Sequence, residues 1–295
     1  MNHYNRKKGI LYIILAAFCF SSMTLCVRLA GNIPTMEKCM FRNLPALFIA
    51  FAVLRKGKES YRNFKKDQWI DLFFRCFFGS TGMVFNFLAI DHIGLADANM
   101  LNKMSPFFAM FFSVFLLKEI PSKFEWFLLA LAFGGAVLVV KPSGGMNSIY
   151  HFVGLYSGLG AGIAYTFVRR LGIKGVQGPL IVFAFSLLTC LLCLPFMVLN
   201  YTPMSLGQFF ILLLAGLFGA GGQFSITAAY ESAPAKEISV FDYTQVLFAA
   251  LLGLVFFGEF PDSKSLLGYT IIIGAAVVKW KSENQSKAEI KPPQQ

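Results

Sequence analysis

Apolar residues occur along this chain in ten continuous stretches, which short polar segments separate. A helix of roughly 20 residues crosses a hydrocarbon core of about 30 Å, and each stretch is close to that length. Because the stretches are continuous rather than alternating, they predict helices and not a membrane barrel. We therefore expect an all-α membrane protein with ten transmembrane helices. To within a few residues, the stretches are Ile10–Leu29, Thr35–Leu54, Trp69–Ile90, Leu95–Leu117, Phe124–Val140, Ile149–Val168, Pro179–Leu199, Leu206–Tyr230, Ile238–Phe257 and Ser265–Trp280.

The second half of the chain repeats the pattern of the first half. When the sequence is shifted by 140 residues, Gly79–Leu138 falls on Gly219–Val278 without a gap, and ten of the 60 pairs are identical. The matched Gly, Glu and Pro residues occur at the same points of the same apolar pattern, which indicates one structural unit used twice. Five crossings per unit give the second unit the opposite orientation, so we predict an inverted 5+5 repeat. The predicted parts are 1–147, 148–280 and a disordered cytoplasmic tail, 281–295.

Composition and charge support this interpretation. With 56% hydrophobic and 14% charged residues and a mean hydropathy of +0.62, the chain has too few polar residues to cover a soluble globule. The net charge of +11 follows membrane topology, because 19 Lys and Arg residues lie on the side of the N-terminus and only Lys141 and Lys264 lie in the opposite loops. This asymmetry places both termini in the cytoplasm and removes the reason to expect a nucleic-acid partner. Residues 6–27 could form a signal peptide, but without a small-residue cleavage site we expect a retained first helix.

Two segments carry a resemblance to a known family. The first is Ala96–Phe108, which is followed by Glu119 at the end of the same apolar stretch; the second is Phe241–Val246, which is followed by Glu259. They resemble the fourth and ninth helices of the EamA type of the drug/metabolite transporter superfamily, and the resemblance extends over residues 9–280. It implies a multi-pass carrier in the plasma (inner) membrane that moves small polar metabolites, amino acids or drugs by alternating access.

Lys103 is the most informative charge, since members of that family usually carry a small or apolar residue at this point. An ammonium group inside a helix costs a few kcal/mol, so we expect it to face a wet cavity or to snorkel to the outer surface about 8 to 12 Å away. Asp242 is the matching anion, about 6 Å inside its helix from the cytoplasmic side, unless it serves as an N-cap. Because the two depths differ by roughly 14 Å, we expect no direct ion pair unless the helices bend, which Pro106 permits.

Other polar side chains inside the predicted helices could line the same passage. Each neutral one could instead hydrogen-bond a neighbouring helix, and Arg42 could pair with Glu37 or Asp97. The candidates for substrate contact are Asn102, Lys103, Asp242, Tyr243, Gln245, Ser21, Tyr165, Asn86, Gln223 and Arg42. One cation and one anion in a shared cavity suit a zwitterion, such as an amino acid or a related compound.

The chemistry expected of this chain is transport rather than catalysis. No nucleotide-binding loop is present, so transport should be secondary, and the three histidines lie at the terminus or in outer loops. A coupled proton would then need a carboxylate, with Asp242 first, followed by Asp97 and Glu37. We expect no cofactor and no metal, because Cys190 and Cys193 have C-x-x-C spacing without a nearby His or further Cys.

Two alternatives to a carrier remain open at this point. A channel or membrane-embedded sensor would share the fold but lack alternating access. A membrane-embedded enzyme would need a nucleophile and a base facing the cavity, and the sequence offers no such pair, so we expect no enzyme. The expected partners are a small polar metabolite and membrane lipids. The identity of the substrate, the direction of transport, the coupling ion and the oligomeric state are left open by the sequence.

Overall fold

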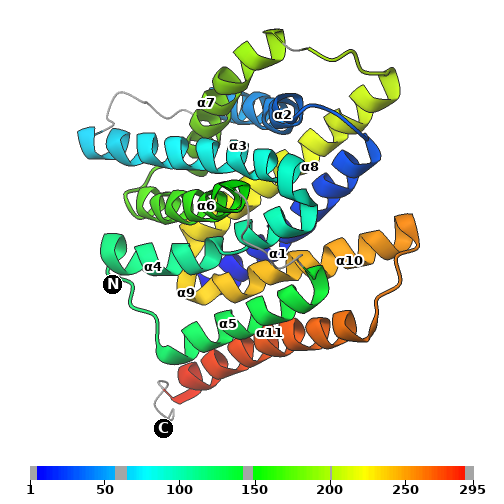
Figure 1. The fold of residues 1–295 in the computed structure, drawn as a ribbon. Coiled ribbons are helices and arrows are strands. Elements are labelled where there is room, and N and C mark those ends of the chain that lie inside the picture. The colour runs from blue at the N-terminus through cyan, green and yellow to red at the C-terminus, as the bar shows by residue number, and fades with distance from the viewer. Residues whose placement is uncertain (1–4, 57–64, 142–148, 200, 290–295) are drawn as a thin grey trace.

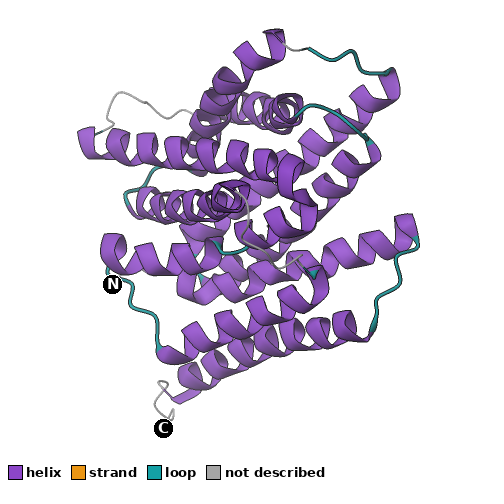
Figure 2. Cartoon of the chain, in the orientation of Figure 1, coloured by secondary structure: helices purple, strands orange, loops and turns teal. Residues whose placement is uncertain are grey.

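The computed structural model describes residues 5–56, 65–141, 149–199 and 201–289, and in these ranges the regular structure is entirely helical (Figure 2). Helix α3 lies beside α6, α1 packs along α8, and α5 and α11 lie side by side at the lower edge of the molecule (Figure 1). The elements are α1 (Arg6–Leu29), α2 (Thr35–Lys56), α3 (Lys66–Asn102), α4 (Ser105–Leu117), α5 (Lys123–Val140), α6 (Ile149–Ile173), α7 (Gly178–Leu199), α8 (Leu206–Ser232), α9 (Ala235–Ile238), η2 (Ser239–Tyr243), α10 (Thr244–Phe257) and α11 (Ser263–Glu289).

Seven helical segments of the described chain are long and apolar enough to cross a membrane. Of the long helices outside this set, α2 has Glu37, Lys38 and Arg42 in its first turns, which lowers its apolar character. The seven segments are Arg6–Leu29, Lys66–Ile93, Asp97–Leu117, Lys123–Val140, Gly178–Leu199, Leu206–Ser232 and Ala235–Phe257. Helix α11 continues as far as Glu289, past Trp280, where we expected the helix to end and a disordered tail to begin.

The boundaries of two predicted helices differ from those in the structure. Helix α3 continues without a loop from Lys66 to Asn102, so the predicted boundary before Leu95 is wrong; the break comes instead at Lys103 and Met104. Pro106, in the first turn of α4, gives the physical reason, because proline lacks an N–H and fits the start of a helix. The predicted helix Ile238–Phe257 is likewise divided into α9, the 3-10 segment η2 and α10.

The 140-residue repeat reappears in the local geometry. Helices α4 and α10 end at the equivalent residues Leu117 and Phe257, and each is followed by a left-handed residue, Lys118 with φ 57° and Gly258 with φ 65°. In both copies the next N–H, that of the glutamate, donates to a carbonyl six residues earlier at 3.3 Å. The two helix ends therefore close by the same hydrogen bond, as a duplicated unit requires.

Glycine allows α6 to approach its neighbours closely. A Cβ atom at Gly158 would lie 2.5 Å from the Leu101 carbonyl oxygen, and one at Gly162 would lie 2.5 Å from the Phe108 Cβ. Contact at this distance between helices is possible only without a side chain, which is the small-residue packing typical of membrane helices. Helix α6 is thereby held against the end of α3 and the start of α4, on either side of the break at Lys103.

Gly162→Ala tests this packing. The added methyl group would also lie 2.8 Å from the Ala109 nitrogen, a backbone atom that cannot move independently. We expect a loss of about 1–3 kcal/mol of stability, measured as a lower midpoint of thermal unfolding in detergent. Gly134→Ala is the matched control, because a Cβ at Gly134 meets no atom within 4 Å and alanine favours the helix. Equal midpoints for the two variants would contradict the packing argument.

Candidate functional site

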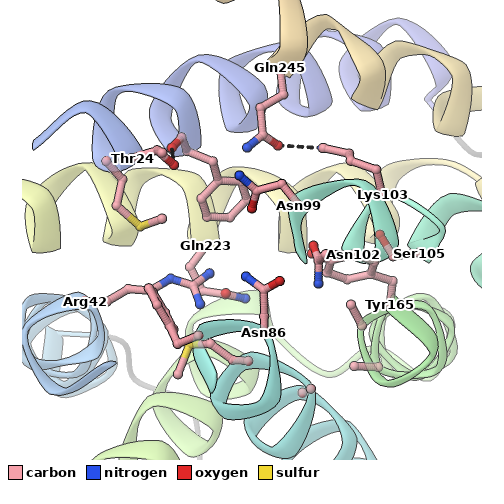
Figure 3. A pocket seen from close by; sticks show the side chains of 18 of the residues that line it. Thr24, Arg42, Asn86, Asn99, Asn102, Lys103, Ser105, Tyr165, Gln223 and Gln245 are labelled. Atoms are coloured by element: carbon pink, nitrogen blue, oxygen red, sulfur yellow. Dashed lines mark hydrogen bonds between the residues drawn. The ribbon is translucent and has the colours of Figure 1, made fainter. Parts of the chain in front are cut away.

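A polar cavity lies where α1, α2, α3, α4, α6, α8 and the η2–α10 segment meet (Figure 3). Its volume is about 160 Å³. A second cavity of about 290 Å³ lies beside it, between α1, α5 and α10, and the two share Thr24, Asn99, Asn102, Lys103 and Gln245. The shared wall is therefore polar, and it contains the residue that sequence reasoning ranked first.

Lys103 and Asp242 form a direct ion pair in this wall. The Lys103 Nζ atom lies 2.9 Å from Asp242 Oδ2 and 2.6 Å from Gln245 Oε1, and both charged side chains are almost fully buried. Our expectation that depth would keep the two charges apart is thus wrong. That estimate counted residues along continuous helices, whereas Lys103 stands at the break after α3 and Asp242 lies in the 3-10 segment before α10.

The two helix breaks also contact each other through equivalent residues of the repeat. The Tyr243 hydroxyl donates to the Lys103 carbonyl oxygen at 2.9 Å, and these two residues are 140 positions apart. Tyr243 is fully buried and lines neither cavity, so it holds the break in position rather than offering a surface to a ligand. Ser21 acts from α1 in the same way, because its hydroxyl donates to the Gln245 carbonyl oxygen at 2.8 Å.

The remaining predicted candidates divide between cavity and helix contacts. The Asn102 side chain donates to the Ser157 hydroxyl at 3.1 Å, and that hydroxyl lies 3.4 Å from Asn86 Oδ1, so both amides are anchored to α6. Tyr165 stacks on Tyr230 with ring centroids 4.8 Å apart. All the predicted candidates except Ser21 and Tyr243 line the first cavity, and Ser21 lines the second.

The alternative coupling carboxylates lie elsewhere. Glu37 is buried and accepts a hydrogen bond from the Thr202 N–H at 2.8 Å, at the start of α2. Asp97 is also buried, and neither residue lines either cavity. Of the three carboxylates proposed for coupling, only Asp242 therefore reaches a cavity.

Two arginines in the first cavity have no counter-ion within the described residues. Arg42 does not pair with Glu37 or Asp97 and instead lies 5.5 Å from the Phe20 ring. Arg75, which is 2% exposed, lies 4.4 Å from the Phe185 ring. Sequence reasoning did not select Arg75, although its position inside an apolar stretch is the same signal that selected Lys103. Asn99 lines both cavities, but no pattern in the sequence distinguishes it from other polar residues.

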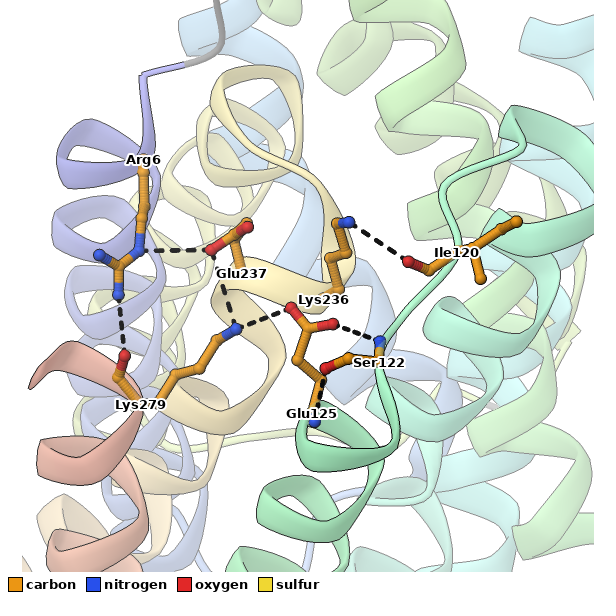
Figure 4. A network of polar contacts seen from close by, with 7 residues as sticks. All are labelled: Arg6, Ile120, Ser122, Glu125, Lys236, Glu237 and Lys279. Carbon is orange, nitrogen blue, oxygen red and sulfur yellow. Dashed lines mark hydrogen bonds and ion pairs between the residues drawn. The ribbon is translucent and has the colours of Figure 1, made fainter. Parts of the chain in front are cut away.

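Buried ion pairs close the end of the molecule where α1 begins and α11 passes Lys279, which we call the terminal end (Figure 4). Glu237 lies 3.3 Å from Arg6 and 3.8 Å from Lys279, whose Nζ also donates to Glu125 at 2.9 Å. The Arg6 guanidinium further donates to the Lys279 carbonyl oxygen at 3.2 Å. These contacts join α1, α5, α9 and α11 across the terminal end.

Glu119 and Arg169 add a second buried pair at the terminal end, 3.1 Å apart. Burial raises the pKa of Glu119, and the neighbouring Arg169 opposes that rise. Arg169 also donates to the Glu231 carbonyl oxygen at 2.9 Å, so the pair connects the end of α4 with α6 and α8. The pairs around Glu237 and Glu119 at the terminal end therefore have little access to water.

Two ion pairs at the opposite end are exposed to solvent. Arg28 pairs with Glu259 at 2.7 Å and Lys141 with Asp262 at 2.7 Å, and all four side chains are about half exposed. The hydrogen bond from Arg28 lowers the pKa of Glu259, and the one from Lys141 lowers the pKa of Asp262. Because Arg28 and Glu259 line the second cavity, that cavity reaches the exposed end.

Comparison with known proteins identifies the family. The model of the EamA-like transporter family matches the chain twice, at residues 7–141 and 148–279, so the chain belongs to this family. It is similar to the pseudopaline exporter CntI of Pseudomonas aeruginosa, with 32% identity over 275 residues, which cover 92% of this chain and 95% of the exporter. It is also similar to solute carrier family 35 member G1 of Homo sapiens, with 28% identity over 292 residues, 92% of this chain and 80% of that protein.

A solved crystal structure shares the fold. It superimposes with a TM-score of 0.81 at 16% sequence identity, covering 93% of this chain and 98% of that chain. Together with the family match and the apolar helices, these findings establish a multi-pass membrane transporter of the drug/metabolite superfamily, and not an enzyme. The polar cavity is accordingly the candidate site for a transported small molecule.

Lys279→Met tests the charge network at the terminal end. Lys279 is 2% exposed, and its loss leaves Glu125 without its ion-pair partner. Breaking a buried pair on one side costs about 3–5 kcal/mol, so we expect a clearly lower midpoint of thermal unfolding. Lys281→Met, an exposed lysine on the same helix, should leave the midpoint unchanged. A midpoint for Lys279→Met within error of this control would show that the network does not stabilise the protein.

Proposed function

We propose that this chain is a secondary-active transporter that moves a small zwitterionic metabolite, an amino acid or a related compound, by alternating access. The observation that supports this most directly is the Lys103–Asp242 pair in the wall shared by the two cavities. Charges inside a membrane protein are costly, and transporters use them where substrates or ions bind. Helices interrupted at equivalent points of two repeats are the usual sign of such a site.

The ion pair suits a substrate that carries both charges. An ammonium group of the substrate can replace Lys103 beside Asp242, while its carboxylate takes the position of Asp242 beside Lys103. Such an exchange leaves no buried charge without a partner, so its cost is far smaller than that of separating the pair. Gln245 and the amides of Asn99 and Asn102 supply further hydrogen bonds in the same wall.

The two ends of the molecule support alternating access. The second cavity reaches the exposed end, and the buried pairs Arg6–Glu237 and Arg169–Glu119 lie at the terminal end. We propose that these buried pairs separate when the protein opens its cavity toward the terminal end. In that conformation the Arg28–Glu259 pair holds the opposite end closed. The coupling carboxylate in this scheme is Asp242, because Glu37 and Asp97 lie outside the cavities.

The topology belongs to the same proposal. Ten membrane-crossing segments in an inverted 5+5 arrangement, with parts 1–147 and 148–280, would place the terminal end in the cytoplasm of a plasma membrane, as the 19 basic residues on that side indicate. The first residues of α1 and the region of Lys279 in α11 meet at this end, which supports termini on one side. Since the pseudopaline relative is an exporter, we propose outward transport.

Counterflow in proteoliposomes tests the carrier mechanism. Vesicles loaded with unlabelled substrate should accelerate uptake of the labelled form if the protein is a carrier, whereas a channel or sensor gives no acceleration. In Lys103→Met we expect counterflow to fall by about 100-fold or more, since Asp242 is left as an unpaired buried charge. The exposed Lys264→Met is the control and should keep wild-type counterflow. Normal counterflow in Lys103→Met would exclude the ion pair from the mechanism.

Cysteine labelling tests the orientation. In a background without the six native cysteines, we expect Pro203→Cys to react with an impermeant thiol reagent added outside intact cells. Lys65→Cys, which is also exposed, should react only after the membrane is opened. We expect this difference because the connection between α7 and α8 lies at the exposed end, whereas α3 begins at the terminal end. Labelling of Lys65→Cys in intact cells would reverse the proposed topology.

A further inference from the structure

The first cavity holds more positive charge than the Lys103–Asp242 pair uses. Four cationic side chains line it, and Asp242 is the one carboxylate among its lining residues. Lys38 is balanced by Asp91 at 3.7 Å, outside the lining. Arg42 and Arg75 make no ion pair with any described residue, and the buried Nε of Arg75 has no hydrogen-bond partner at all.

The chain is built to accommodate these two guanidinium groups. A Cβ atom at Gly79 would lie 2.1 Å from the Arg75 Nη1 atom, so only glycine leaves room for Arg75 in its observed position. Gly219, the repeat equivalent of Gly79, also lies against an arginine, because its Cβ would lie 3.1 Å from the Arg42 Cγ and 3.2 Å from the Arg42 carbonyl oxygen. Both helices thus lack a side chain where an arginine lies against the cavity wall.

Aromatic rings stabilise these cations without neutralising them. Phe185 lies 4.4 Å from the Arg75 guanidinium and Phe20 lies 5.5 Å from that of Arg42. A cation over a ring face is attracted electrostatically, yet the ring supplies no acceptor for the N–H groups. Arginine cannot lose its proton inside a protein, so the cost of burying these charges persists until an anion binds.

The matching anion is a carboxylate. The planar guanidinium fork binds a carboxylate through two parallel hydrogen bonds, which makes arginine the preferred residue for this contact. Asn86 and Gln223 line the same wall and can donate to a bound carboxylate from their amide groups (Figure 3). Both arginines lie apart from the ion pair that receives the zwitterionic group, since neither contacts Lys103 or Asp242.

We infer that the transported metabolite is an acidic amino-acid derivative, with an excess of carboxylates that Arg42 and Arg75 bind. This inference rests on the proposed transporter function and names the substrate class of its site. The zwitterionic group of the metabolite faces Lys103 and Asp242, and the additional carboxylates face the two arginines. A cationic or neutral amino acid leaves the guanidinium groups without a counter-ion and binds more weakly.

Four probes with the same α-amino-acid group test the charge preference. Ornithine, glutamine, glutamate and γ-carboxyglutamate carry side chains with one positive, no, one negative and two negative charges. Affinity for the purified protein is measured by calorimetric titration and by the thermal-unfolding midpoint at matched ionic strength. We expect affinity to rise in that order, with glutamate bound at least about 10-fold tighter than glutamine. Equal affinity for ornithine or glutamine, or no response to any probe at millimolar concentration, would overturn the inference.

Arg42→Gln and Arg75→Gln show whether the arginines cause the preference. Each variant should lose about 10-fold or more in affinity for γ-carboxyglutamate and change little toward glutamine. Arg55→Gln is the matched control, because Arg55 also lies on a phenylalanine ring, at 5.4 Å from Phe51, but outside the cavity. Unchanged affinity in both cavity variants would overturn the inference, as would equal stabilisation of the wild type by inorganic phosphate alone.

The stability of the ligand-free variants separates binding from a structural role. Since Arg75 is a buried charge without a partner, Arg75→Gln should keep or raise the unfolding midpoint while it weakens binding. A lower midpoint together with unchanged charge preference would make Arg75 a structural residue. Gly79→Ala keeps the charge but displaces the guanidinium, so it should weaken acidic probes as Arg75→Gln does.

Counterflow with the same probes distinguishes the two proposals. If glutamine and ornithine exchange as fast as glutamate, the protein is a carrier and the inferred acidic class is wrong. If γ-carboxyglutamate binds in the predicted order but no probe shows counterflow, the acidic site stands and the transporter mechanism fails.

Discussion

The ion pair between Lys103 and Asp242 connects two interrupted helices at the wall that the two cavities share. It joins the break after α3 to the 3-10 segment before α10, and the Tyr243 hydroxyl holds the same two breaks together through the Lys103 carbonyl. Burial makes each of these charges costly without a counter-ion, so the position of each side chain favours that of the other. The broken helices, the two cavities and the shared polar wall all depend on this mutual requirement.

The ion pairs described above differ in burial between the two ends of the molecule. At the terminal end the charges of Arg6, Glu237 and Lys279 are buried, whereas at the opposite end Arg28 and Glu259 are half exposed. A buried pair resists separation more than an exposed one, because water cannot replace the lost partner. In the described conformation the pairs that are hardest to separate therefore lie at the terminal end, and the second cavity reaches the opposite end.

Glycine has two different uses in this fold. In α6 the glycines bring helices together, so that Gly158 and Gly162 lie against the backbone on either side of the break at Lys103. At Gly79 the missing side chain instead leaves room for the Arg75 guanidinium group, and Gly219 lies against the Cγ and the backbone of Arg42. Glycine thus allows both close helix packing and the placement of an arginine side chain. The glycines that lie against the arginines are at equivalent positions of the two repeats.

The sequence alone predicted the all-helical class, the repeated unit and the family, and it selected most of the polar residues that line the first cavity. Apolar length and positive charge are additive along the chain, so they can be counted without coordinates. Only the tertiary structure decided that Lys103 meets Asp242 and that Arg75 lies in the cavity rather than at a helix edge. Counting depth along a helix assumes that the helix continues, and both predicted helices are interrupted where the charges lie. In addition, lipid and protein interior are both apolar, so the periodicity of such helices does not show which face turns inward.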